Sequence, residues 1–157
     1  MLTIVREAIA SPEEKLPVIL LRTDRLKLAK RIWRGTAEDG EEFGFELAKP
    51  LRHGETIFEN ESKRYVIDQA SEALLEISLD LPPSAAAGIG WAVGNLHLEL
   101  SAEPTRLLTP DDSAARQLLD RLGVSYRVVQ AVFRPGRFAR GDKPAASPQE
   151  LGSSHQH

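Results

Sequence analysis

The hydrophobic pattern of this 157-residue chain changes character near residue 72, and this change constrains the fold more than any other feature. Residues 1–72 contain short runs in which apolar and polar side chains alternate, separated by turn-forming residues. Such alternation predicts half-buried strands. The runs cover residues 3–9, 18–21, 26–32, 43–47 and 65–67. We therefore predict that residues 1–72 form an all-β domain.

Turn signals connect these predicted strands. Asp39-Gly40 predicts a two-residue hairpin, because both residue types tolerate a positive φ. Asn60-Glu61, between Ile57 and Tyr65, predicts a second tight connection. We expect small strands joined by hairpins.

Residues 73–140 alternate between strand and helix signals. We predict strands at residues 73–80, 96–100, 105–108 and 125–133, and helices at residues 83–93 and after Asp111 or Asp112. Gly94 and Gly123 fit the left-handed position that closes each helix. The order β-α-β-β-α-β is that of a ferredoxin-like domain. The predicted fold class is thus α+β: an N-terminal all-β domain, a ferredoxin-like βαββαβ domain, and a flexible tail at residues 141–157 that contains histidine.

Composition limits the chemistry of the chain. It has no cysteine and one methionine, which excludes disulfides, zinc ribbons, iron–sulfur clusters and thiol nucleophiles. Imidazole is then the strong transition-metal ligand available, and it suits nickel, copper and zinc rather than calcium or magnesium. No Walker motif, H-E-x-x-H or G-x-S-x-G occurs, and nothing pairs a nucleophile with a base. We predict that the protein is not an enzyme.

Charge and hydropathy also bear on partners and compartment. The net charge of −3, from 20 basic and 23 acidic residues, argues against binding to nucleic acid. No apolar run is long enough to span a bilayer, and acidic residues interrupt the first fifteen residues, where a signal peptide would be apolar. We expect a cytoplasmic protein that binds neither nucleic acid nor membrane.

Three of the four histidines lie where a metal ion could reach them. His97 is at the predicted corner between a helix and a strand, and His155 and His157 are in the predicted tail. A lone histidine is more often structural than a ligand, but a two-fold dimer would present two copies of His97 near its axis. The tail pair has the alternative interpretation of two histidines by chance. His53, before Gly54, is most simply a turn residue.

Basic residues are interleaved with aliphatic ones between residues 22 and 34. One interpretation is the solvated face of a strand that resists edge pairing. The other is a docking face for an acidic partner. The run comprises Arg22, Arg25, Lys27, Lys30, Arg31 and Arg34, with Leu26, Leu28 and Ile32 between them.

Several linked segments, in order along nearly the whole chain, resemble UreE, the family of urease accessory proteins that act as nickel metallochaperones. The segments are Asp24-Arg25, Asp39-Gly40 with Glu42-Phe43-Gly44, Leu51-Arg52-His53-Gly54-Glu55, Gly94-Asn95-Leu96-His97, Leu118-Leu119-Asp120-Arg121-Leu122-Gly123 and Ala131-Val132-Phe133-Arg134-Pro135.

The resemblance implies a β domain that engages protein partners and a ferredoxin-like domain that dimerises and binds nickel. By matching position, His97 would bind Ni²⁺ with its symmetry mate at the dimer interface, and His155 and His157 would add ligands from the tail. Cu²⁺ or Zn²⁺ can bind such nitrogen ligands in vitro. The implied partners are a second copy of the chain, the urease apoprotein complex and its GTP-hydrolysing accessory protein.

The chain departs from the family pattern near these ligands. The family often reads Tyr-His-Leu-Gly-Asn-Arg-His, whereas Ala92 and Leu96 replace the first histidine and the arginine here. Ser113 stands where many members carry a histidine, and the tail is short. We expect one well-defined site per dimer and little storage capacity. The alternative function is a metal-independent protein-interaction or chaperone module in which the histidines are incidental.

Overall fold

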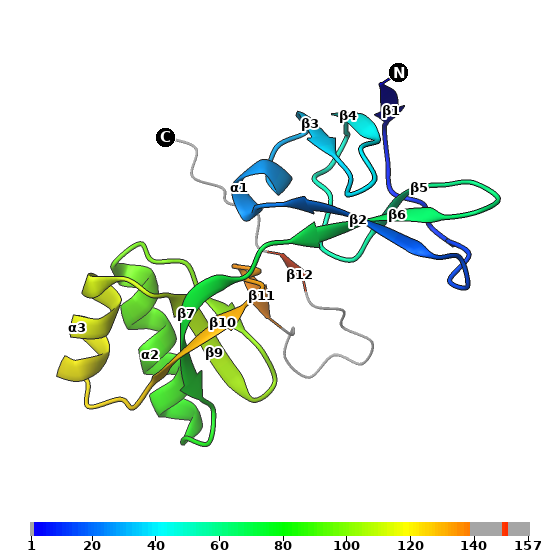
Figure 1. The fold of residues 1–157 in the computed structure, drawn as a ribbon. Helices are drawn as coiled ribbons and strands as arrows, with labels where there is room; N and C mark the ends of the chain where they lie inside the picture. Colours follow the sequence, from blue (N-terminus) through cyan, green and yellow to red (C-terminus); the bar gives the residue numbers. More distant parts are fainter. Residues whose placement is uncertain (1, 139–148, 151–157) are drawn as a thin grey trace. The chain divides into compact units, whose positions relative to one another are not determined.

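The computed structural model describes residues 2–138 and 149–150, and the chain divides into two compact units between Ala70 and Ser71 (Figure 1). Helices and small sheets are mixed, and each unit has its own sheets. None of the described helices is long and apolar enough to cross a bilayer.

The first unit consists of two small sheets and one helical turn. One sheet has the strand order β1-β4-β3 and the other β2-β6-β5. Buried aromatic rings occupy the core, with Trp33 stacked on Phe45 at 4.1 Å between centroids. The elements are β1 (Thr3–Val5), β2 (Val18–Thr23), α1 (Arg25–Leu28), β3 (Ile32–Thr36), β4 (Glu42–Glu46), β5 (Thr56–Glu59) and β6 (Arg64–Gln69).

The two turns predicted at Asp39-Gly40 and Asn60-Glu61 both join antiparallel strands, but the first is not the two-residue turn that we predicted. The turn between β5 and β6 is confirmed, because the Asn60 side chain accepts hydrogen bonds from the backbone N–H groups of Ser62 and Lys63. The two-residue hairpin at Asp39-Gly40 is wrong. Gly40 has φ +90° but Asp39 does not have a positive φ, and the Ala37 N–H donates to the Glu41 carbonyl, so three residues form the connection.

The predicted strand at residues 26–32 is also wrong. Asp24 caps a short helix instead: its side chain accepts a hydrogen bond from the Lys27 N–H at 2.8 Å. Leu28 then points into the core while Leu26 is exposed, and the strand β3 begins only at Ile32. The basic residues of this region therefore do not lie on one strand: they are distributed over β2, α1, the connection between α1 and β3, and β3 itself.

We expected the strands of this unit to be joined by hairpins, which pair strands antiparallel, but two pairs of strands are parallel. β1 pairs with β4, and β2 pairs with β6, both in parallel. Parallel neighbours need long connections, so these pairings join segments far apart in the sequence.

In the second unit, two helices pack on a four-stranded sheet. The strand order is β10-β7-β9-β8, with every neighbour antiparallel. Leu75 and Ile77 of β7 pack with α2 and α3, whereas Leu74 packs with Leu108 and Phe133 on the opposite face. The elements are β7 (Glu72–Ser78), α2 (Pro83–Asn95), β8 (Ser101–Ala102), β9 (Arg106–Pro110), α3 (Ser113–Arg121), β10 (Arg127–Ala131), β11 (Arg137–Phe138) and β12 (Gln149–Glu150).

The predicted ends of α3 are confirmed. Asp112 is the N-cap, and its side chain accepts hydrogen bonds from the N–H groups of Ala114 and Ala115. Gly123 has φ +67°, its N–H donates to the Asp120 carbonyl, and the Val124 N–H donates to the Leu119 carbonyl. These two bonds form a Schellman motif, in which a left-handed residue ends the helix.

The predicted strand at residues 96–100 is wrong. α2 continues to Asn95, and the turn that closes it uses the next three residues. Only Ser101–Ala102 pairs with β9 in this region.

Candidate metal site

The candidate ligand His97 closes helix α2. The His97 N–H donates to the Gly94 carbonyl at 2.9 Å, and the Leu98 N–H donates to the Val93 carbonyl at 3.2 Å. This is the same Schellman motif that ends α3, with His97, at φ +58°, in the position that glycine fills there. The prediction that Gly94 takes the left-handed conformation is wrong, because Gly94 lies inside the helix.

The backbone on both sides of His97 is held by buried groups. Val93 is fully buried, and Leu98 and Leu100 pack against the same core. The hydroxyl of Thr109, itself fully buried, donates to the Glu99 carbonyl at 2.8 Å. The chain therefore holds the Cα of His97 in a fixed place after the helix.

The imidazole of His97 is exposed at this fixed place. It makes no hydrogen bond or ion pair with any residue in the described part of the chain. His97 is also the one described non-glycine residue with a positive φ, a conformation that costs an L-residue on the order of 1–2 kcal/mol. Backbone strain at a residue whose side chain makes no hydrogen bond or ion pair is typical of functional positions.

His53 has a different environment, in the first unit. Its Nδ1 accepts a hydrogen bond from the Gln69 N–H at 2.9 Å, so in the neutral ring Nε2 carries the proton. Neither nitrogen then offers a free lone pair to a metal. The interpretation of His53 as a turn residue agrees with its place before Gly54, which has φ +87°.

The described residues bring no complete ligand set together. Within residues 2–138 and 149–150 there is no group of three histidine, cysteine, aspartate or glutamate side chains that could hold a metal ion. His155 and His157 lie outside the described residues. The described part of the site is thus one imidazole on a rigid support.

A cavity of about 740 Å³ lies between the end of β7, helix α2 and the end of α3. Its lining is mainly apolar, includes Trp91, and has Asp80 as its one ionisable group among the described lining residues. His97 is not part of this lining. The cavity therefore offers no set of metal ligands.

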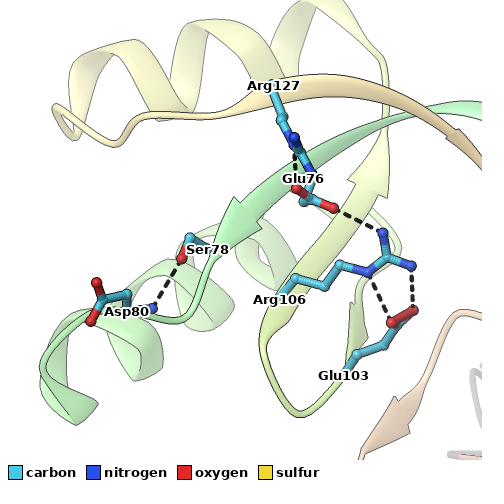
Figure 2. Close-up of polar contacts among 6 residues, drawn as sticks. All are labelled: Glu76, Ser78, Asp80, Glu103, Arg106 and Arg127. Atoms are coloured by element: carbon cyan, nitrogen blue, oxygen red, sulfur yellow. Dashed lines mark hydrogen bonds and ion pairs between the residues drawn. The ribbon is translucent and has the colours of Figure 1, made fainter.

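Sequence reasoning missed a charged network on the face of the β10-β7-β9-β8 sheet that is opposite the two helices (Figure 2). Glu76 on β7 is paired with Arg127 on β10 and with Arg106 on β9, and Arg106 also pairs with Glu103. The two guanidinium groups, that of Arg127 first, lower the pKa of Glu76. Glu76 between the buried Leu75 and Ile77 is the sequence signal that it faces the other way. Because the carboxylates and guanidinium groups pair with one another, the network connects strands β7, β9 and β10 and does not form a ligand site.

Comparison with known proteins gives one consistent family. Residues 72–157 match the family model described as UreE urease accessory protein, C-terminal domain. The chain is 33% identical over 124 residues to urease accessory protein UreE 1 of Brucella suis biovar 1 (strain 1330), covering 78% of this chain and 74% of that protein. It is 33% identical over 113 residues to UreE of Staphylococcus saprophyticus, covering 68% and 75%. It is 29% identical over 142 residues to UreE of Ruegeria sp. (strain TM1040), covering 88% and 77%.

Proposed function

Because the chain belongs to the UreE family of urease accessory proteins, we propose that it carries Ni²⁺ and delivers it for assembly of the urease active site. Family membership makes it an accessory protein of urease maturation and not an enzyme. We propose that residues 1–72 engage protein partners, and that residues 73–140 form a ferredoxin-like domain that dimerises. The strand order β10-β7-β9-β8 with two crossover helices supports that domain type.

The exposed imidazole of His97, on a strained backbone position, carries the proposal. A neutral imidazole nitrogen is a good ligand for Ni²⁺, and this ring lies at a position where glycine would cost less. A residue with a strained backbone, whose side chain makes no hydrogen bond or ion pair within the described residues, is well explained by a ligand that comes from outside.

A homodimer would supply the second imidazole. In a two-fold dimer, a residue near the axis meets its own symmetry mate. Exposed apolar side chains of helix α2 and its C-cap support such an interface: Trp91 is 72% exposed and Leu96, the C-cap, is 40% exposed. A second copy could bury both side chains and place the two His97 rings together.

We propose that His155 or His157 completes the coordination. The Gly136 N–H donates to the Leu100 carbonyl at 2.8 Å, and β11 contacts β8, so the chain returns beside the segment that follows His97. His155 lies five positions after Glu150, in the last described strand, and five residue steps can span at most about 18 Å. A site that combines the paired His97 rings with separate imidazoles can lose its ligands one at a time, which suits a carrier that must release its metal.

The receivers we propose are the urease apoprotein complex and the GTP-hydrolysing accessory protein that acts with it. The names of the relatives support a place in urease maturation. Ni²⁺ is the proposed cargo, and Cu²⁺ or Zn²⁺ can compete for the same nitrogen ligands in vitro.

Calorimetric titration with Ni²⁺ tests the proposal, with the oligomeric mass recorded in the same samples. We expect one Ni²⁺ per dimer for the parent chain, loss of binding in His97→Ala, and weaker binding after truncation behind Gly152. His53→Ala is the matched control and should bind like the parent. Binding should weaken in acidic solution, because protons compete with the metal for the imidazole nitrogen. A folded His97→Ala variant that binds Ni²⁺ like the parent would contradict the proposed site.

The alternative is a metal-independent interaction module, which the exposed aliphatic side chains of the first unit favour. Urease activity in cells at limiting nickel separates the two functions. His97→Ala abolishes activity if the chain is a nickel carrier, whereas activity is unchanged if the chain only holds a protein.

A further inference from the structure

Helix α1 and the first residue of β3 display unusually exposed apolar side chains. Ile32 is 78% exposed and Leu26 is 73% exposed, more than any other large hydrophobic residue in the described part of the chain. Their neighbours Leu28 and Trp33 are buried, and this fixes the direction of both side chains. Leu26 lies opposite Leu28 on the helical turn, and Ile32 alternates with Trp33 on the strand. The backbone conformation therefore directs the side chains of Leu26 and Ile32 into solvent.

Cations flank these two aliphatic side chains. Lys27, Lys30, Arg31 and Arg34 are exposed, and none of them has an ion pair with a residue of the described ranges. By contrast, the nearby Arg22 is paired with Glu38 at 2.9 Å and lies 3.8 Å from Asp68. The sequence has no acidic residue between positions 25 and 37, although the whole chain has a net charge of −3. We call the group Leu26, Lys27, Lys30, Arg31, Ile32 and Arg34 the basic–aliphatic surface.

We propose that the basic–aliphatic surface binds an acidic segment of a partner protein, in which aliphatic side chains alternate with carboxylates. Aliphatic side chains of the partner would cover Leu26 and Ile32 and remove them from water, the main source of affinity in such contacts. Carboxylates would pair with the surrounding lysines and arginines and set the orientation. This proposal rests on the proposed partner-binding role of residues 1–72 and names the surface and the partner chemistry. It is independent of the proposed nickel function, because the surface lies in the first unit and uses none of the histidines.

Other occupants fit the surface less well. Binding of single-stranded nucleic acid needs exposed aromatic rings for stacking, and the one aromatic residue of the segment, Trp33, is only 7% exposed. A membrane-bound amphipathic helix needs several turns, whereas α1 has four residues.

Selection from a random 12-residue peptide display library, with the full-length chain as bait, tests the proposal. We expect enriched peptides that combine aspartate or glutamate with leucine, isoleucine or valine. The strongest peptide is then synthesised and titrated into isotope-labelled protein, and amide shifts are expected to cluster at residues 24–34. Affinity should fall with added salt, because exposed charge pairs are screened.

Three variants make the titration decisive. Leu26→Ser/Ile32→Ser and Lys30→Glu/Arg31→Glu should each weaken the peptide at least tenfold. The matched control combines Val18→Ser with Lys49→Glu, an exposed apolar and an exposed basic residue of the same unit, and it should bind like the parent. Because no buried side chain is changed, all three proteins should keep the parent fold.

Several results would overturn the proposal that this surface binds an acidic–aliphatic segment. A selection without an acidic–aliphatic consensus, or amide shifts outside residues 24–34, overturns the proposal. Tighter binding to vesicles with phosphatidylserine, to single-stranded DNA or to a second copy of the chain also overturns it in favour of that occupant. Nickel titration of the same variants separates the two proposals. Variants of the basic–aliphatic surface can lose peptide binding while Ni²⁺ binding at His97 persists, and His97→Ala can lose Ni²⁺ binding while peptide binding persists.

Discussion

At the scale of the residue, the decisive position is His97. It closes α2 in the left-handed conformation that Gly123 adopts at the end of α3, with the same pair of backbone hydrogen bonds. Glycine takes this conformation without steric cost, whereas a side chain with a Cβ does not. The chain thus places an imidazole where backbone energetics alone would favour glycine. We attribute the presence of histidine at this position to a function of its imidazole ring and not to a contribution to the stability of the fold.

Replacing His97 with glycine tests that view. His97→Gly should raise the free energy of unfolding by about 1 kcal/mol relative to His97→Ala, because the left-handed strain disappears. Urea denaturation of the two variants measures the difference. Both variants should lose Ni²⁺ binding by calorimetry. If His97→Gly is less stable than His97→Ala, the position is not strained in the way the backbone indicates.

At the scale of the element, one cluster ties the connection between β3 and β4 to strand β6. The Tyr65 hydroxyl donates to Asp39 Oδ2 at 2.7 Å, and Lys63 Nζ lies 2.8 Å from the same oxygen. The ring of Tyr65 is buried in the core of the first unit. These hydrogen bonds, that of Lys63 first, lower the pKa of Asp39 to about 2, and the pKa of Lys63 is raised in turn. The cluster therefore joins the two sheets of this unit through one ionised carboxylate.

This cluster predicts a pH-dependent contribution to stability. The folded pKa of Asp39, about 2, lies below the unfolded value of about 3.9. The stabilisation is therefore fully present above about pH 4 and is lost as the pH falls toward 2. Asp39→Asn keeps an oxygen acceptor but removes the charge, so the parent should have the higher Tm at pH 6, and the difference should shrink between pH 4 and pH 2. Thermal unfolding at several pH values measures it.

A control for this experiment is Glu61→Gln in the same unit. Glu61 is exposed and has no hydrogen bond or ion pair with a described residue, so its replacement should change Tm little at any pH. A Tm difference between the parent and Asp39→Asn that stays constant down to pH 2 would mean that Asp39 is not held ionised.

At the scale of the whole molecule, the two units have separate cores. The buried cluster of the first unit uses residues between Val5 and Ile67, and the clusters of the second use residues between Leu75 and Leu119 and around Phe133. Among the described residues, no buried residue belongs to the cores of both units. A unit with its own core can fold by itself.

We therefore predict that residues 71–157 fold without the first unit. The fragment should keep a cooperative thermal transition and a dispersed NMR spectrum. It should also bind Ni²⁺ with the stoichiometry of the full chain, since His97, His155 and His157 all lie within it. Circular dichroism, NMR and calorimetry provide the measurements. An unfolded fragment would show that the first unit supplies stability that its separate core does not indicate.

The sequence by itself determined the features that depend on a few neighbouring residues. The cap at Asp112, the stop at Gly123 and the side-chain bonds of Asn60 all form between residues at most five positions apart, so local residue types specify them. The change of pattern near residue 72 likewise came from local periodicity. His97 was identified as a candidate ligand, but from residue type and resemblance and not from its conformation.

The tertiary structure alone decided the features that depend on distant contacts. The parallel pairing of β2 with β6 joins residues more than forty positions apart. At Arg25–Leu28 the local cap at Asp24 begins the helical turn, and burial of Leu28 in the core selects this turn over the predicted strand. The left-handed His97 follows from Val93 and Leu98, which pack into one core and force the chain to turn between them. Neighbouring residues cannot encode these outcomes, because the free energy that selects them comes from burial against segments elsewhere in the chain.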